Sequence, residues 1–232
     1  MQIKLQQAFH RRHARGGFTL VELLIVIAII SILMTVGAIG IGGLAGGKGV
    51  STAVASAEAY FDTARTTAIG NGCKARFLVD VGDPNASTYL KRIIIVYQDR
   101  DAEGVLQPDS WVQLDRGIVL PDGVFFSRDL SVKDLESGTG GELETQNLSG
   151  GEIKTAYQGE YVYYEFNAEG ICTTPGASFV VGQGARPPGA SKPSVTAAGK
   201  RDFGGFVVWR NGRTSLIKSP DQLNIPSTQK TF

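Results

Sequence analysis

Histidine is almost absent from this sequence. The 232 residues include only two histidines, His10 and His13, so nothing after residue 13 can supply an imidazole. This removes the usual Ser-His and Cys-His couples, and the commonest metal ligand, from the rest of the chain. The glycines from Gly46 to Gly49 also lack the spacing and the hydroxyl residue of a phosphate-binding loop. The sequence therefore argues against an enzyme and predicts neither a metal nor a cofactor, leaving open only a membrane-anchored hydrolase that uses carboxylates alone.

Cysteine is equally scarce, with Cys73 and Cys172 as the two representatives. Their spacing excludes a zinc knuckle and a Cys-x-x-Cys redox pair. A disulfide between them would close a loop of roughly 100 residues and could add up to about 4.7 kcal/mol in the chain-entropy model. Two separately buried thiols, acting as small apolar side chains, are the alternative. The sequence leaves both open.

Acidic residues are missing from the first 17 positions, and an apolar run follows. The run extends from Phe18 to Ile41 and contains one ionisable side chain, Glu22. A helix of about 24 residues, rising about 1.5 Å per residue, can cross a hydrocarbon core of roughly 30 Å. We therefore expect a single-pass membrane helix. The bases before it predict a cytoplasmic N-terminus and an exported remainder, which in a Gram-negative cell lies in the periplasm; they are Lys4, Arg11, Arg12 and Arg15.

Glu22 needs an explanation, because a carboxylate at the centre of a bilayer helix costs about 2.5 to 3.5 kcal/mol on insertion scales. The run from Gly17 to Glu22, Gly-Phe-Thr-Leu-Val-Glu, resembles the processing site of type IV prepilins and type II secretion pseudopilins. The resemblance implies that a prepilin peptidase cuts after Gly17 and that the new N-terminus at Phe18 is methylated. It also implies that Glu22 pairs with the terminal amine of a neighbouring subunit during assembly.

The resemblance further implies a structural subunit of a type II secretion pseudopilus or a type IV pilus. Its partners would be the peptidase, other pilin or pseudopilin subunits, the inner membrane and the secretion or pilus machinery. Two other interpretations are a signal anchor whose Glu22 snorkels to the interface, and a secretory signal peptide cut beyond Ala38. Without the first 17 residues, which hold four bases and no acid, the formal charge falls from +1 to −3.

A second helical pattern follows, from about Ser51 to Ile69. Its apolar residues recur at spacings of three and four, and Gly70-Asn71-Gly72 supplies a stop signal. With the strand expected at Ala75 to Asp80, this pattern resembles the pseudopilin H and FimT-like minor pilins. Arg65 is interpreted as a solvated charge on the helix surface. The apolar stripe consists of Val50, Val54, Ala57, Phe61, Ala64 and Ala68.

Beyond Ala75 the apolar period is two, which is typical of strands. The fold class predicted is α+β, with one long N-terminal helix packed on antiparallel sheet. The expected domains are a leader (1–17), a transmembrane helix (18–41), a glycine-rich hinge with the outer half of the helix (42–69), and a periplasmic β-rich domain (70–232). Further strands are predicted at Tyr89 to Tyr97, Ser110 to Asp115, Gly117 to Leu120, Gly123 to Ser127, Tyr161 to Phe166, Ala177 to Val181, Gly205 to Arg210 and Arg213 to Ile217.

Several segments carry expectations that only a structure can test. Seven glycines between Gly37 and Gly49 favour either a weak point in the helix or close packing of helix on helix in lipid. The segments Glu136 to Glu152 and Gln183 to Asp202 are expected to be mobile loops. The turn from Asp99 to Gly104 has alternating oxygen ligands, as in a calcium loop, but lacks the glutamate at the twelfth position. A polar hairpin is the preferred interpretation of that turn.

FimT-like minor pilins of natural competence can bind DNA through a Gly-Arg-x-Arg signature, and here the stretch from Gly212 to Ser215 lacks the second arginine. A modest basic patch remains, with Trp209 available for stacking. A mildly acidic exported domain argues against wholesale nucleic-acid binding. A DNA-binding competence pilin is therefore the alternative function, and its candidate contacts are Arg210, Arg213 and Lys218.

Overall fold

The computed structural model describes residues 20–135, 140–150, 152–196, 202–217, 219–223, 225–226 and 228–232, and gives no side chains for 31–48. The chain forms two units, Met1–Ile41 and Gly42–Phe232, and each is described by itself. The cleavage and methylation positions, Gly17 and Phe18, lie outside the described residues, and so does Lys218.

A single long helix, α1, runs from Leu20 to Asn71. Its backbone is helical across all seven glycines between Gly37 and Gly49, so the helix does not melt there. A hinge that opens on packing into a filament stays a prediction. The helix ends as the Gly70-Asn71-Gly72 signal predicts: the Gly72 N–H donates to the Ile69 carbonyl at 3.3 Å and the Cys73 N–H to the Ala68 carbonyl at 3.2 Å.

The second half of α1 buries the predicted apolar stripe. All six residues of that stripe are buried, and the alanines among them are fully inaccessible. Short side chains on this face allow strands to approach the helix axis closely. The stripe also includes two neighbours that the spacing did not select, Ala53 and Tyr60.

Two antiparallel sheets cover this half of the helix. The larger sheet has the order β3-β2-β1-β7-β6, with β4 paired to β2, and the smaller has the order β10-β9-β8-β5. The larger sheet comprises β1 (Ala75–Asp80), β2 (Arg92–Arg100), β3 (Leu106–Gln113), β4 (Ile118–Val119), β6 (Thr145–Leu148) and β7 (Gly159–Phe166). The smaller comprises β5 (Val124–Phe126), β8 (Ser178–Gln183), β9 (Phe203–Val208) and β10 (Thr214–Ile217), and two short 3-10 helices lie at Thr155–Tyr157 and Pro220–Leu223.

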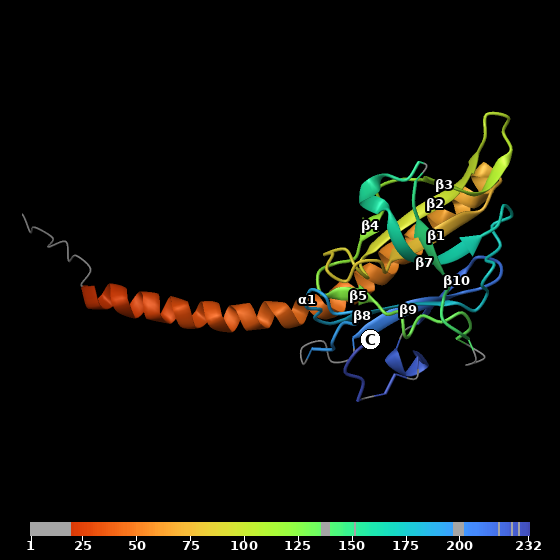
Figure 1. The fold of residues 1–232 in the computed structure, drawn as a ribbon. Coiled ribbons are helices and arrows are strands. Elements are labelled where there is room, and N and C mark those ends of the chain that lie inside the picture. Colours follow the sequence, from red (N-terminus) through yellow and green to blue (C-terminus); the bar gives the residue numbers. More distant parts are fainter. Residues whose placement is uncertain are drawn as a thin grey trace, which may run out of the picture. The chain divides into compact units, whose positions relative to one another are not determined.

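Phe61 joins the helix to both sheets. Its ring contacts Phe77 and Phe166 of the larger sheet, with centroids 5.2 and 4.8 Å apart, and Phe206 of the smaller sheet at 5.5 Å. Phe206 in turn stacks on Phe179 at 5.0 Å. In Figure 1 this part of α1 runs between the strands labelled β1 and β2 and those labelled β8 and β9. The predicted α+β class, a helix packed on antiparallel sheet, is confirmed.

Each predicted strand is present, although several begin or end a few residues away from the prediction. The expectation of a loop throughout Glu136 to Glu152 is wrong, because Thr145–Leu148 forms the edge strand β6 on β7. Its composition is polar since an edge strand can leave one side to solvent. The other expected loop, Gln183 to Asp202, is partly ordered by hydrogen bonds in its described residues. Ala185 and Ser194 exchange two backbone hydrogen bonds of 2.9 Å.

Gly205 lies where β9 passes closest to β8. A Cβ atom there would stand 2.0 Å from the Phe179 carbonyl oxygen, which is backbone and cannot rotate away. The strand pair β8–β9, and with it the position of Phe206 under the helix, requires glycine at this position.

We expect Phe61→Ala to lower the free energy of unfolding by about 3 to 5 kcal/mol, because the cavity left between two sheets cannot collapse from both sides. Urea unfolding of the purified chain in detergent, followed by tryptophan fluorescence, measures this. Thr63→Ala, on the exposed face of the same helix, is the matched control and should change stability by less than about 0.5 kcal/mol. A loss below about 1.5 kcal/mol for Phe61→Ala would show that the ring does not join the sheets energetically.

Candidate functional site

The first described turns of α1 form an apolar surface on every side of the helix. The large apolar side chains between Leu20 and Ile30 are 44% to 76% exposed. A helix that is apolar all round is normally covered by protein or lipid. Glu22 lies in the first turn, where the helix dipole favours a carboxylate. This segment therefore needs a covering partner, and it presents one acidic side chain at its start.

Within the part of the chain that the structure describes, no helix combines the length and the apolar character needed to cross a membrane. The membrane span proposed for Phe18 to Ile41 stays a prediction.

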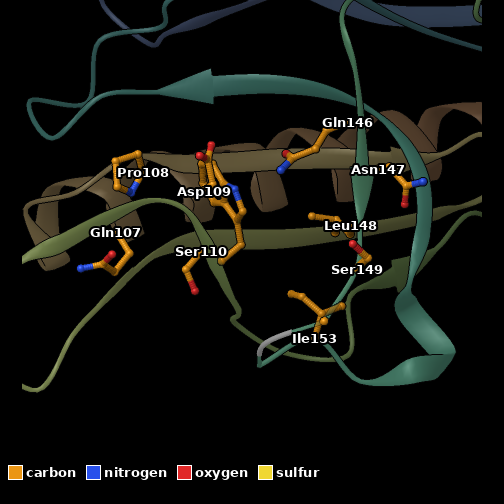
Figure 2. A pocket seen from close by; sticks show the side chains of 11 residues that line it. Gln107, Pro108, Asp109, Ser110, Gln146, Asn147, Leu148, Ser149 and Ile153 are labelled. Atoms are coloured by element: carbon orange, nitrogen blue, oxygen red, sulfur yellow. The ribbon is translucent and has the colours of Figure 1, made fainter.

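The outermost strands of the larger sheet line one cavity of about 430 Å³. Figure 2 shows the β3 residues from Gln107 to Ser110 on one side and β6 on the other, where Gln146 points toward β3 and Asn147 points away. Strands β3 and β6 are the two ends of the sheet order, so the sheet must curl strongly to bring them to one cavity. The curl encloses a second apolar cluster, which includes Trp111, Leu148 and Ile153.

Arg76 contacts two of the residues that line this cavity, Trp111 and Gln146. Its guanidinium lies 4.2 Å from the ring centroid of Trp111 and 4.1 Å from that of Tyr163, and it forms an ion pair of 2.6 Å with Glu165. It also donates to the Gln146 side-chain oxygen. Arginine between two aromatic rings with a paired carboxylate is a stable arrangement. These polar groups are therefore committed to the fold rather than free for a ligand.

Arg65 is not the solvated charge that the sequence suggested. Its Nε donates to the Gly170 carbonyl at 3.2 Å, and a Cβ atom on Gly212 would stand 2.6 Å from its stem. Gly212 has a φ of 73°, which glycine adopts readily in the Asn211-Gly212 turn. The prediction is wrong because the stem of Arg65 packs under two turns that are distant in sequence.

Two of the three candidate DNA contacts, Arg210 and Arg213, lie on the β9–β10 turn. Arg210 and Arg213 are exposed there, as is part of Trp209, whose Nε1 donates to the Ser215 hydroxyl at 2.7 Å. A cavity of about 440 Å³ beside the turn is lined by Arg213 and Arg65 but also by two acids of α1. The acids, Glu58 and Asp62, balance the bases around this cavity. The described residues around this cavity therefore give no one-signed field for a phosphate backbone.

The turn from Asp99 to Gly104 is the tip of the β2–β3 hairpin, as its preferred interpretation predicted. The Asp101 carboxylate accepts the Glu103 and Val105 backbone N–H groups at 3.1 and 2.7 Å, and the Gln107 amide at 2.8 Å. Its oxygens are thus used within the turn. Among the described residues, no three His, Cys, Asp or Glu side chains gather as metal ligands.

The two cysteines are buried free thiols, so the disulfide left open by the sequence is not formed. Ala75 pairs with Phe166, and Cys172 pairs with the other side of Phe166. Two strand spacings, about 9.6 Å, therefore separate Cys172 from the strand that follows Cys73. A disulfide needs Cα atoms within about 7 Å. Burial raises the pKa of both thiols.

Pairs of carboxylates line several cavities, among them the one beside the β9–β10 turn. Asp80 and Asp83 line another, but the Asp80 oxygens accept from Gly82 and Thr88 and Asp83 accepts from Asn85, all within the local turn. Glu58 and Asp202 line an apolar cavity of about 310 Å³. The presence of carboxylate pairs in cavities therefore does not distinguish between the two hypotheses, a structural subunit and a hydrolase that uses carboxylates alone.

Together these features define a class of protein. Its long N-terminal helix exposes an apolar surface in the first described turns and packs between two antiparallel sheets in its second half. Comparison with known proteins adds to this. Residues 12–38 match the prokaryotic N-terminal methylation motif. The chain therefore carries an N-terminus of the prepilin type, and the resemblance seen in Gly17 to Glu22 is confirmed.

One similar solved structure is the minor pseudopilin EPSH from the type II secretion system of Vibrio cholerae. The match covers 72% of this chain and 97% of that one, with 15% sequence identity and a TM-score of 0.34. A TM-score this low supports no functional conclusion. No curated protein sequence matches the chain.

Asp202 gives a pH-dependent stability that can be measured. Burial raises the pKa of its carboxyl above the ordinary 3.8, so the folded chain holds a proton that the unfolded chain releases. The stability contributed by this proton is complete below about pH 3.8 and is lost as pH rises through the folded pKa. We expect Asp202→Asn to unfold at a higher temperature than wild type at about pH 7, with no difference below about pH 3.8.

Asp122→Asn is the matched control for this measurement. Lys91 lowers the pKa of Asp122, so its carboxylate stabilises the fold above its ordinary pKa and the substitution should not raise the unfolding temperature at neutral pH. A lower unfolding temperature for Asp202→Asn at neutral pH would contradict the assignment of Asp202 as a destabilising buried charge.

Proposed function

We propose that this chain is a minor pilin or pseudopilin, a structural subunit that a prepilin peptidase cuts after Gly17. The new N-terminus at Phe18 is methylated, and the subunit joins a type II secretion pseudopilus or a type IV pilus. The observation that carries the proposal is the methylation motif at residues 12–38, placed on a helix that is apolar all round and has one carboxylate in its first turn.

The physical argument concerns the carboxylate. An ionised group in an apolar, water-poor surrounding is costly unless an opposite charge meets it. The terminal amine of a neighbouring processed subunit is such a charge. Because this charge is on the main chain, the apolar surface needs no basic side chain to supply it. Pairing with Glu22 would therefore fix the axial register between neighbouring helices. In this function the chain assembles and does not catalyse.

The same proposal sets the location and the partners. The leader faces the cytoplasm, the helix lies in the inner membrane, and the sheet unit lies in the periplasm, where it contacts other subunits and the secretion or pilus machinery. The absence of histidine after His13 and the mixed charge around Arg213 support a structural subunit over a hydrolase and over a DNA-binding competence pilin.

Intact-mass analysis of the chain from cells with and without the prepilin peptidase tests the processing step. We expect a species that begins at Phe18 and carries one methyl group, and we expect it only in cells that have the peptidase. Peptidase-deficient cells should yield the uncut chain. An uncut chain in both strains, or a start beyond Ala38, would contradict the proposal in favour of a signal anchor or a secretory signal peptide.

Glu22→Gln should separate processing from assembly. The amide is close in shape but cannot pair as an ion, so we expect normal cleavage and methylation together with loss of most of the assembled subunit. Incorporation into the filament fraction should fall by about tenfold, the effect of losing a charged hydrogen bond worth about 1.5 kcal/mol.

The control for Glu22→Gln is Glu103→Gln, which removes an exposed carboxylate at the β2–β3 hairpin tip. It should leave both processing and incorporation unchanged. Equal incorporation of the Glu22→Gln and wild-type chains would show that this carboxylate does not set the register.

A further inference from the structure

A cavity of about 310 Å³ lies between α1 and the strands β9 and β10, and we call it the helix–edge cavity. Its apolar lining comes from both sides. The helix contributes Val50 and Val54, and the strands contribute Phe203, Leu216 and Ile217. Leu216 is 49% exposed, which is a high value for a leucine beside a buried helix face. The cavity is therefore open to solvent and is lined by apolar side chains that the subunit alone leaves partly uncovered.

The charged side chains among the described residues that line this cavity have one sign. They are Glu58 and Asp202, and none of the described lining residues is a lysine or an arginine. Glu58 accepts a hydrogen bond from the Thr214 hydroxyl. The Oδ2 atom of Asp202, in contrast, is buried and has no hydrogen-bond partner among the described residues. A buried carboxylate oxygen without a donor is unfavourable, so this cavity favours a ligand that brings positive charge.

The surroundings of the cavity can admit another polypeptide. Strand β10 is the last strand in the order β10-β9-β8-β5, so among the described residues no further strand of that sheet pairs with its outer edge. The helix–edge cavity shares Ala55 and Glu58 with the larger cavity beside the β9–β10 turn. Together the two cavities follow α1 past the small side chains of Ala55 and Ala59, where a second chain can approach the helix closely.

We propose that the helix–edge cavity receives a lysine or arginine side chain from a neighbouring subunit of the same filament. The methylene stem of that side chain packs on Leu216 and Phe203, and its charged end reaches Asp202 and Glu58. Long basic side chains combine an apolar stem with a charged tip, which matches an apolar cavity that ends in two acids. The cavity thus provides a subunit contact in the periplasmic unit, separate from Glu22. This inference rests on the proposed function.

A photo-crosslinking amino acid, p-benzoyl-phenylalanine, at position 216 of the full chain tests the proposal in cells that assemble the filament. We expect crosslinks to another prepilin-type subunit, or to a second copy of this chain, at a lysine or arginine or an adjacent residue. Asp202→Asn should reduce their yield by about tenfold, as expected for one charge-assisted hydrogen bond. The same photo-crosslinker at position 119, which is exposed on β4, is the control and should be insensitive to Asp202→Asn.

Several outcomes would overturn the proposal. They are crosslinks from position 216 that fall on residues 197–201 of the same chain, crosslinks only to lipid or to proteins outside the filament, and a yield that Asp202→Asn leaves unchanged.

A charge swap tests whether Asp202 acts across the interface or has only a structural role within the subunit. Asp202→Lys, combined with aspartate at the crosslinked basic position, should restore the yield if the two groups meet across an interface, and failure to restore it would also overturn the proposal.

Failure of this proposal can be told apart from failure of the proposed function. Intact-mass analysis of the same cells reports processing at Phe18 independently of any contact at Asp202. A methylated chain without the crosslink would leave the filament subunit in place and remove only the helix–edge contact. An unprocessed chain would remove the filament, and the basis of this inference with it.

Discussion

The burial of an apolar helix surface away from water is the constraint on which this structure depends. The second half of α1 meets it inside the subunit, because two antiparallel sheets bury the helix stripe and Phe61 contacts both of them. The first described turns, from Leu20 to Ile30, expose large apolar side chains. The same helix is thus buried by the sheets in its second half and exposes an apolar surface in its first described turns.

Residue size decides how the covered half is built. Alanines on the buried stripe bring the helix close to the strands, and Gly205 lets β9 approach the β8 backbone. The large side chains are concentrated at the centre, where rings from the helix and from both sheets meet edge to face or stacked. Such a core leaves little freedom for the sheets to shift, which suits a unit that presents fixed surfaces to neighbouring subunits.

Among the charged side chains of the sheet unit, some are paired within the unit and one has a buried oxygen without a described partner. Arg76 is fully engaged by Glu165 and two aromatic rings, and Arg65 supports two turns, so these bases hold the unit together. Asp202 is different, since burial raises its pKa and its Oδ2 finds no donor among the described residues. A buried acid without a donor among the described residues is a place where a partner can contribute more than it would on a fully solvated surface.

The sequence by itself determined the prepilin-type N-terminus, the helix stop at Gly70 to Gly72, the buried stripe and nearly every strand. Each of these depends on residues that are close in the chain, through a motif, a period of 3.6 or two, or a glycine with a particular φ. Tertiary structure decided the rest. Strand β6 forms only because β7 offers it an edge, Arg65 is packed only because Gly170 and Gly212 fold over it, and Cys73 and Cys172 stay apart because β7 lies between them. Glu58 and Asp202 likewise line one cavity although they are far apart in sequence, and local patterns carry no information about such an arrangement.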